Sequence, residues 1–375
     1  MNTLREKIEA EIRKRGPIPF SRYMEMCLYD DEFGYYTRHA AQFGKAGDFY
    51  TSSDVHAVFG RLMARQFDEM WRVLGSPAEI TVKELGPGRG LFAQDVLDWS
   101  EKKFPNFFRA LRYVLEERSP ALRERIENTL GRRFEAGNAS FAVAEWTSAT
   151  PTIVFANEFF DALPVEVVSS QGSLRIDAQH GRFTELWVPS SDKELEFLDR
   201  YSVHPETGER IEVSLLAPKY VSDMAGSERG FFVVIDYGYT REEQLEGRHR
   251  GTLKAIRQHS VSANPYEAPG EQDITADVNF TALAAAAEGE GMQTRKVITQ
   301  SQFLMGIGEG NQFADAFEDC RLPQERAKVA LQLKHLVTPA GMGESFHVLV
   351  GSKGVEREKA EGLSGLGFGS KELRG

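Results

Sequence analysis

A glycine-rich turn between an expected strand and an expected helix is the segment whose residue types point most clearly to chemistry. Residues 80–85 form a short apolar run, residues 91–99 have helical periodicity, and Gly86, Gly88 and Gly90 lie between them. A strand that ends in glycines and restarts as a helix is the arrangement in which nucleotide-binding folds hold their ligand. A proline interrupts this loop, and no Lys-Ser or Lys-Thr pair follows to hold a triphosphate. The turn therefore favours, as its ligand, a nucleoside linked to an amino acid rather than ATP.

An acidic residue precedes the turn and suits such a ligand. Glu84 stands two residues before the first glycine, where its carboxylate can receive an ammonium group. S-adenosylmethionine carries both a nucleoside and an ammonium group, and it is the expected cofactor. The alternative is that the glycines only supply the positive φ of a tight turn.

A second expected strand, residues 111–117, also ends in acid. It follows the glycine turn by about the spacing at which βαβ nucleotide folds place an acid on the ribose hydroxyls. We expect Glu117 to have this role, with Glu116 as the alternate. The alternative is a solvent-exposed glutamate at the end of a strand.

Polar side chains close another apolar run, residues 152–158, and continue into the loop after it. Asn157, Glu158 and Asp161 lie there, together with Phe159 and Phe160. The carboxyl ends of strands in an open α/β sheet face the ligand crevice. We therefore expect the three polar residues at the site of chemistry and the two phenylalanines as its apolar walls. The alternative is a polar turn with two core phenylalanines.

Three further positions are weaker candidates. Thr51, at the start of an expected helix, could bind an anionic group of the ligand, or its loop could serve only to cap that helix. Asp236 ends the expected strand 230–238, and His259 lies in a long polar connection, residues 239–279. A histidine can accept a proton near neutral pH, although a lone histidine is more often structural.

Composition limits the class of protein and its partners. The chain has 375 residues, of which 41% are hydrophobic and 27% charged, and its net charge is −11. An acidic chain is a poor partner for nucleic acid. Two cysteines, Cys27 and Cys320, provide neither a disulfide framework nor a zinc site, and we expect no metal. The sequence contains no apolar run long enough to span a membrane and no leader-like segment at its start, so a cytoplasmic protein is expected.

The order of the expected elements defines a fold. Seven strands are expected, with the glycine turn after the first, an acid after the second and a polar loop after the fourth. This is the layout of an α/β, Rossmann-like class I methyltransferase with a mostly parallel seven-stranded sheet. The expected domains are an N-terminal helical cap (1–75), the Rossmann-like core (76–164 and 230–354), a β-hairpin and helical insertion (165–229) and a flexible tail (355–375). The hairpins at 165–188 offer a contact surface for a homodimer.

Several motifs resemble those of the MidA-like family of S-adenosylmethionine-dependent methyltransferases, over about residues 4–353. They are Gly47-Asp-Phe-Tyr-Thr-Ser52, Glu84-Leu-Gly-Pro-Gly-Arg-Gly90, Ala156-Asn-Glu-Phe-Phe-Asp-Ala-Leu-Pro-Val165, Ile235-Asp-Tyr-Gly238, Pro269-Gly-Glu-Gln-Asp-Ile-Thr275 and Met342-Gly-Glu-Ser-Phe-His347. The chain departs from the family pattern at Ser53, where a proline is usual, and at Asp277, where a histidine is usual. No role is carried over to Asp277.

The resemblance implies a reaction and an acceptor. The family is related to a mitochondrial complex I assembly factor that methylates arginine, which implies a protein acceptor such as a respiratory complex I subunit in a bacterial cytoplasm. Glu158 and Asp161 would then hold the guanidinium, and His259 would take the released proton. Asn157 would accept a hydrogen bond from the target nitrogen, contact the cofactor or steady the loop. The alternatives are a non-catalytic cofactor-binding assembly factor, a methyltransferase of small molecules and a dinucleotide-dependent oxidoreductase. The oxidoreductase would require G-x-G-x-x-G, whereas Leu91 and Phe92 follow Gly90.

Overall fold

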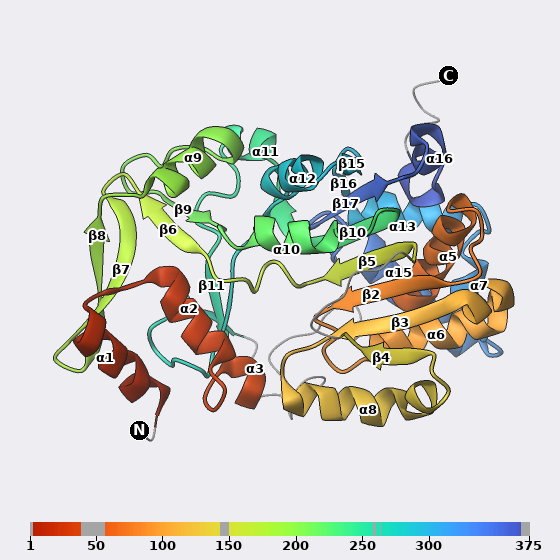
Figure 1. Cartoon of the computed structure of the whole chain (residues 1–375), viewed down its shortest axis with the longest axis horizontal. Helices are drawn as coiled ribbons and strands as arrows, with labels where there is room; N and C mark the ends of the chain where they lie inside the picture. The colour runs from red at the N-terminus through yellow and green to blue at the C-terminus, as the bar shows by residue number, and fades with distance from the viewer. Residues whose placement is uncertain (1–2, 39–56, 143–149, 258–259, 263, 369–375) are drawn as a thin grey trace. The chain divides into compact units, whose positions relative to one another are not determined.

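The structure is a computed structural model that describes residues 3–38, 57–142, 150–257, 260–262 and 264–368. The chain divides into two compact units (Figure 1). Unit 1 comprises residues 1–49, 159–221 and 238–286, and unit 2 comprises residues 50–158, 222–237 and 287–375.

A mostly parallel sheet forms the centre of unit 2. Its strands follow the order β15-β17-β10-β5-β2-β3-β4. Their bounds are β2 Ile80–Leu85, β3 Leu111–Glu116, β4 Ala139–Phe141, β5 Thr152–Asn157, β10 Gly230–Tyr239, β15 Gln293–Thr294 and β17 Phe346–Lys353. The pairs among β4, β3, β2, β5 and β10 are parallel, and β17 runs antiparallel to β10. The expected seven-stranded sheet and the α/β fold class are confirmed.

Two short strands extend this arrangement, and the edges of the sheet differ from expectation. β16, Ile298–Thr299, pairs with β17, and β14, Val278–Asn279, pairs with the last two residues of β10. The sixth expected strand, residues 292–298, is therefore divided into β15 and β16. The third expected strand, residues 141–146, was placed too late in the chain, because β4 begins at Ala139 and residues 143–149 lie outside the described ranges.

Helices and one aromatic cluster build the core of unit 2. The helices are α5 Ala57–Val73, α6 Leu91–Lys103, α7 Pro105–Ala110, α8 Pro120–Glu135, α13 Gln300–Glu309, α14 Ala314–Phe317 and α15 Pro323–Val337. α6 packs on α5 and on α8. The ring of Phe92 on α6 stacks on that of Phe155 in β5, with 4.6 Å between the ring centroids. This stack ties the helix after the glycine turn to a central strand, and burial of both rings stabilises it.

Residues 355–368, which we expected to be a flexible tail, instead pack on α5. α16 spans Arg357–Glu361, and a 3-10 turn follows at Ser364–Leu366. The Ser364 hydroxyl donates to Glu69 at 2.6 Å, and the Gly365 N–H donates to Gln66 at 3.0 Å. The charge and glycine content of this segment led to the prediction of a flexible tail, although Ala360 and Leu363 are buried.

Unit 1 combines the N-terminal helices with antiparallel strands. α1 Leu4–Arg15, α2 Phe20–Tyr29 and α3 Tyr35–Arg38 lie in this unit, and a five-stranded sheet has the order β1-β7-β6-β9 with β8 on β7. The bounds are β1 Ile18–Pro19, β6 Glu166–Ser169, β7 Gly172–Gln179, β8 Arg182–Val188 and β9 Arg210–Val213. The expected hairpins in 165–188 are confirmed. The expected helical cap, by contrast, is divided: α1, α2 and α3 share a core with the hairpins, whereas α5 packs in unit 2.

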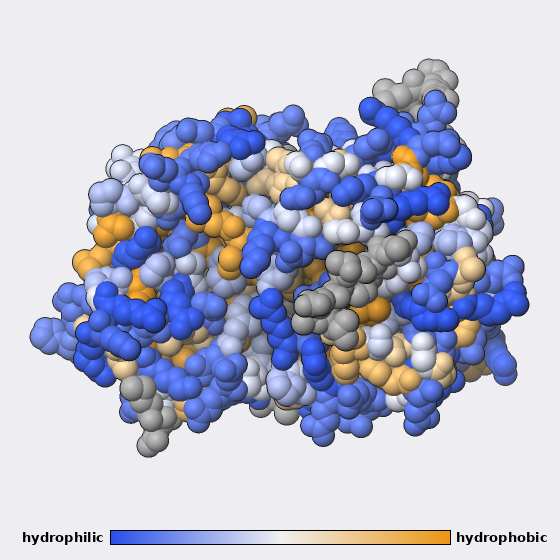
Figure 2. Space-filling model, in the orientation of Figure 1, coloured by the Kyte–Doolittle hydropathy of each residue, from blue (hydrophilic) through white to orange (hydrophobic). Residues whose placement is uncertain are grey.

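The long connection 239–279 also folds within unit 1. It contains α11 Arg241–Leu245 and a small antiparallel sheet of β11 Lys254–Arg257, β12 Ser260–Ser262 and β13 Asp273–Thr275. Other helices among the described residues are α9 Asp192–Tyr201, α10 Ala217–Met224 and α12 Phe280–Gly289. Across the described ranges, no helix is both long and apolar enough to cross a membrane. Hydrophilic residues predominate on the face shown in Figure 2.

Candidate functional site

The glycine turn leaves β2 in a backbone conformation that requires glycine. Gly86, Gly88 and Gly90 have φ values of 63°, 55° and 74°, in the left-handed region that other residues rarely adopt. The Gly90 N–H donates to the Pro87 carbonyl at 2.8 Å, and Gly90 is the N-cap of α6. A Cβ added to Gly88 would meet no described atom within 4 Å. Among the described residues, nothing therefore fills the space beside Gly88.

The parallel register aligns the ends of three strands. Leu85 of β2 lies opposite Glu116 of β3 and Ala156 of β5. On β5, Asn157 lies opposite Ile235 of β10, and β10 continues beyond this point to Tyr239. The glycine turn and the residues after β3 and β5 therefore leave the sheet at neighbouring positions on one edge.

Glu84 is buried beneath this edge, with 5% of its surface exposed. Its Oε2 accepts a hydrogen bond from the Tyr113 hydroxyl at 2.8 Å. Burial raises the pKa of Glu84 to about 8, and the bond from Tyr113 opposes that rise only in part. A cationic ligand group would favour the charged carboxylate. The residue thus fits the ammonium of an amino-acid-bearing nucleoside.

The two acids at the end of β3 have different surroundings. Glu116 is held by the ammonium group of Lys83, with 2.6 Å between Nζ and Oε2. Glu117 accepts the Ser119 N–H at 2.8 Å through Oε1, and burial raises its pKa. Since Glu116 is committed to an ion pair, Glu117 suits ribose hydroxyls better than its neighbour does.

The end of β5 carries a strained residue. Glu158 has a φ of 49°, which is costly for a side chain other than glycine and typical of functional positions. Its N–H donates to the Ile235 carbonyl at 3.0 Å, and its Oε1 accepts the Asn157 amide Nδ2 at 3.2 Å. The Asn157 Oδ1 is buried and has no hydrogen-bond partner among the described residues. A buried acceptor without a donor is expensive, and a bound hydroxyl or amine would satisfy it.

Asp161 lies in unit 1 and is buried. Its carbonyl accepts the Ala276 N–H at 3.0 Å. The next residue, Ala162, accepts a hydrogen bond from the Tyr29 hydroxyl at 2.8 Å. These two bonds fix the loop that follows β5.

An acid that the sequence did not single out lies near Asp161. Asp273, also buried, accepts the Tyr36 hydroxyl at 2.9 Å. Burial raises the pKa of Tyr36 well above its usual value, and the charges of Asp273 and Asp161 raise it further. Both carboxylates therefore lie close to one phenol. Sequence spacing could not reveal this cluster, because Asp161 and Asp273 are 112 positions apart in the chain.

The remaining candidates are less informative. Phe159 packs edge-on against Phe160, with ring centroids 5.3 Å apart. Asp236 is fully buried and accepts the N–H of Tyr237 at 2.9 Å. Thr51 and His259 lie outside the described residues. The described part of the chain contains no cluster of three or more His, Cys, Asp or Glu side chains that could hold a metal ion.

The comparison with family models identifies the class. A model described as "Putative S-adenosyl-L-methionine-dependent methyltransferase" matches residues 62–298. The chain belongs to this family. The resemblance to MidA-like methyltransferases that the motifs indicated is therefore confirmed.

Relatives and a solved structure agree with this assignment. The chain is 29% identical to the Drosophila melanogaster mitochondrial protein arginine methyltransferase NDUFAF7 homolog, covering 98% of this chain and 88% of that protein. The human mitochondrial protein arginine methyltransferase NDUFAF7 is 27% identical, over 90% of this chain and 80% of its own length.

A crystal structure from Burkholderia thailandensis decides the cofactor. That protein, bound to S-adenosyl-homocysteine, is 27% identical and superposes with a TM-score of 0.83, covering 96% of this chain and 94% of its own. A native crystal structure from the same organism has a TM-score of 0.79. The expected cofactor, S-adenosylmethionine, is confirmed, and this MidA-like protein is an S-adenosylmethionine-dependent methyltransferase.

The space beside Gly88 gives a first prediction. Gly88→Ala should weaken S-adenosylhomocysteine binding at least tenfold, since the added methyl group enters the space that adjoins the turn. Gly137→Ala is the matched control, because Gly137 also has a positive φ of 73° and an open Cβ position in the same unit. Both variants should lose roughly 1–2 kcal/mol of unfolding free energy from backbone strain. Isothermal titration calorimetry and thermal unfolding measure the two effects. Equal affinity of the two variants would contradict the assignment of the turn.

The raised pKa of Glu84 gives a second prediction. Below about pH 8 the free protein holds a proton on this carboxyl, and an ammonium ligand requires the carboxylate. Binding should therefore release up to about one proton between about pH 6 and 7, and affinity should rise with pH until about pH 8. Calorimetry in two buffers of different ionisation enthalpy counts the protons. Glu84→Gln should abolish the release, and proton release that persists in this variant would exclude Glu84 as its source.

Proposed function

We propose that this MidA-like methyltransferase transfers the methyl group to an arginine side chain of a protein. Two lines of support converge on this acceptor. Relatives aligned over 90–98% of this chain, in Drosophila and human, are named protein arginine methyltransferases. The chain also carries buried or strained carboxylates, Glu158 and Asp161, in the loop after β5, and carboxylates are the groups that bind a guanidinium fork.

The chemistry required of the protein is limited. The bound cofactor supplies an activated methyl group on its sulfonium. An arginine side chain remains protonated under ordinary conditions, with a pKa above about 12. Its positive charge must be held at one end of the guanidinium so that a nitrogen lone pair at the other end can attack. Glu158 is our candidate for this task, with Asp161 as its partner from the same loop.

The left-handed backbone of Glu158 is the observation that carries this proposal. A φ of 49° turns the chain sharply where β5 ends. The side-chain amide of Asn157 donates to the Glu158 carboxylate. We infer that the strain directs this carboxylate toward the acceptor. Asn157, whose Oδ1 lacks a donor among the described residues, is proposed to accept a hydrogen bond from the cofactor or from the target nitrogen.

The family resemblance supports a proposal for the acceptor protein. We propose a respiratory complex I subunit as the acceptor, because the related mitochondrial assembly factor methylates arginine on such a subunit. The proposal requires an exposed arginine on that subunit, and the acidic net charge of −11 favours association with a basic segment.

A conservative substitution tests the role of Glu158. Glu158→Gln keeps the size of the side chain but removes its charge, so methyl transfer should fall by at least about 100-fold while S-adenosylhomocysteine affinity changes less than about threefold. Transfer of tritiated methyl groups to bacterial protein, followed by acid hydrolysis and detection of methylarginine, measures the reaction.

Glu127→Gln provides the control, since Glu127 is an exposed glutamate of α8 in unit 2. This variant should match the unmodified enzyme in both assays. Parallel loss of affinity and transfer in Glu158→Gln would move Glu158 from the acceptor to the cofactor. Label recovered only on residues other than arginine would overturn the proposed acceptor.

A further inference from the structure

The cofactor is a zwitterion at its amino-acid end, and one of its two charges has no partner assigned so far. S-adenosylmethionine and S-adenosylhomocysteine both carry an ammonium group and a carboxylate on the same carbon atom. Glu84, buried directly before the glycine turn, fits the ammonium group. A carboxylate that leaves water is costly unless a cation or several hydrogen-bond donors pair with it. A partner for this carboxylate is therefore expected close to Glu84 and the turn.

The acids at this sheet edge cannot serve as that partner. Glu84 and Glu117 are both desolvated, which raises their pKa values, and Glu158 adds a third carboxyl group directly after β5. Carboxylates at short distance repel one another where little water separates them. The anionic end of the ligand therefore requires a positive charge from the protein.

Two cations near this edge are engaged elsewhere, and a third is open to solvent. Lys83 forms the ion pair with Glu116. The guanidinium of Arg123 donates from Nε to the carbonyl of Glu117 at 2.7 Å. Arg118 is exposed and follows Glu117, on the side where the ribose is expected. A further cation stands in the glycine turn itself.

Arg89 is this cation, and it lies between two glycines with left-handed backbones. Gly88 and Gly90 have φ values of 55° and 74°, and Arg89 is partly buried between them. α6 begins directly after Gly90, and the first N–H groups of a helix add partial positive charge. The buried acid Glu84 thus precedes the turn and a cation follows Gly88, which matches the two charges of a zwitterion bound over the turn.

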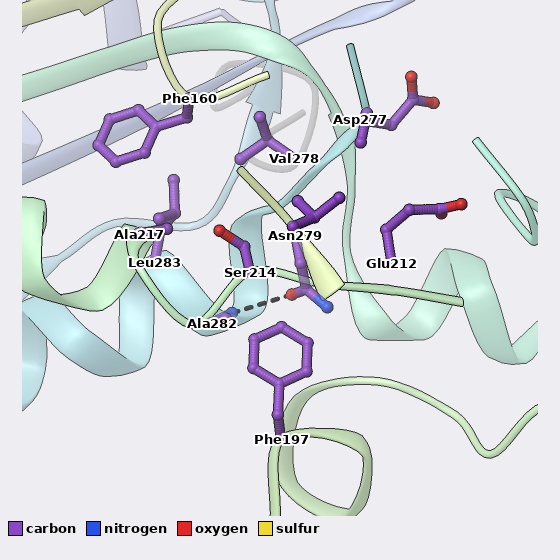
Figure 3. A pocket seen from close by; sticks show the side chains of 12 residues that line it. Phe160, Phe197, Glu212, Ser214, Ala217, Asp277, Val278, Asn279, Ala282 and Leu283 are labelled. Atoms are coloured by element: carbon purple, nitrogen blue, oxygen red, sulfur yellow. Dashed lines mark hydrogen bonds between the residues drawn. The ribbon is translucent and has the colours of Figure 1, made fainter. Parts of the chain in front are cut away.

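A pocket within unit 1 does not offer an alternative place for the carboxylate. Its walls, shown in Figure 3, include two acids, Glu212 and Asp277, and the described residues that line it include no lysine, arginine or histidine. Glu212 accepts the Thr252 N–H at 3.0 Å, and Asp277 pairs with Lys254 at 3.2 Å. A pocket that contributes acids and no cation disfavours an anionic ligand group.

We propose that the guanidinium of Arg89 binds the carboxylate of the cofactor, while Glu84 binds the ammonium group on the same carbon atom. A guanidinium presents its N–H groups in a planar fork that matches the two oxygens of a carboxylate. The turn would then select a nucleoside linked to an amino acid over one that lacks it. The inference does not depend on the proposed function, because the cofactor is the same for every methyl acceptor.

The test measures the affinity of Arg89→Gln for two ligands by isothermal titration calorimetry. One ligand is S-adenosylhomocysteine, and the other is its decarboxylated analogue, which keeps the nucleoside, the sulfur and the ammonium group. Arg89→Gln should bind S-adenosylhomocysteine at least about 30-fold more weakly than the unmodified protein, because a charge-assisted pair is lost. Its affinity for the analogue should change less than about threefold, since that ligand has no carboxylate to lose.

Arg89→Lys is a second variant that keeps the positive charge and removes the fork. It should lose about fivefold in affinity for S-adenosylhomocysteine and keep its affinity for the analogue. Arg109→Gln is the matched control, because Arg109 is an exposed arginine of α7 in the same unit, directly before the amino end of β3. This variant should bind both ligands as the unmodified protein does.

Two results would overturn the inference. Equal losses for both ligands in Arg89→Gln would mean that Arg89 supports the turn or the nucleoside and not the carboxylate. Unchanged affinity for S-adenosylhomocysteine in this variant would mean that other donors, such as the first N–H groups of α6, hold the carboxylate alone.

Discussion

The aligned ends of the parallel strands are the constraint on which the cofactor site depends. The register places Leu85, Glu116 and Ala156 side by side, so whatever follows these residues emerges at one edge of the sheet. The segment after each strand must then turn away from the sheet at once. After β2 the turn uses three left-handed glycines, and after β5 it uses a left-handed glutamate. Both turns lead the chain away from the sheet edge where the cofactor is expected, and only the turn at Glu158 carries backbone strain. The strands behind this edge are buried.

Burial controls the chemistry of the acids around this edge. Glu84 and Glu117 both have raised pKa values because they are desolvated. Glu116, by contrast, forms an ion pair with Lys83. A ligand cation or hydrogen-bond donor favours the charged form of a desolvated acid. In unit 1, burial would raise the pKa of Asp277, but the hydrogen bond with His249 and the charge of Lys254 outweigh it, so the pKa is lowered.

Sequence could predict the strands and their ends because these features are local. Apolar runs, glycines and terminal acids lie within a few residues of one another, which is how β2, β3 and β5 and their acids were found. The division of 1–75 between two units was not predicted, since α1 and α5 both have amphipathic periodicity and only long-range packing separates them. The pairs Tyr36–Asp273 and His249–Asp277 were missed for a related reason. Each joins residues separated by a long stretch of chain, and no periodic pattern marks them.

A crystal structure of the protein with S-adenosylhomocysteine tests the central claim most directly. The account predicts a nucleoside over Gly88, ribose hydroxyls on Glu117, the amino group within about 3.5 Å of Glu84 and the sulfur facing Asn157 and Glu158. A nucleoside bound away from the edge formed by β2, β3 and β5 would contradict it. So would a sulfur atom that pointed away from the end of β5.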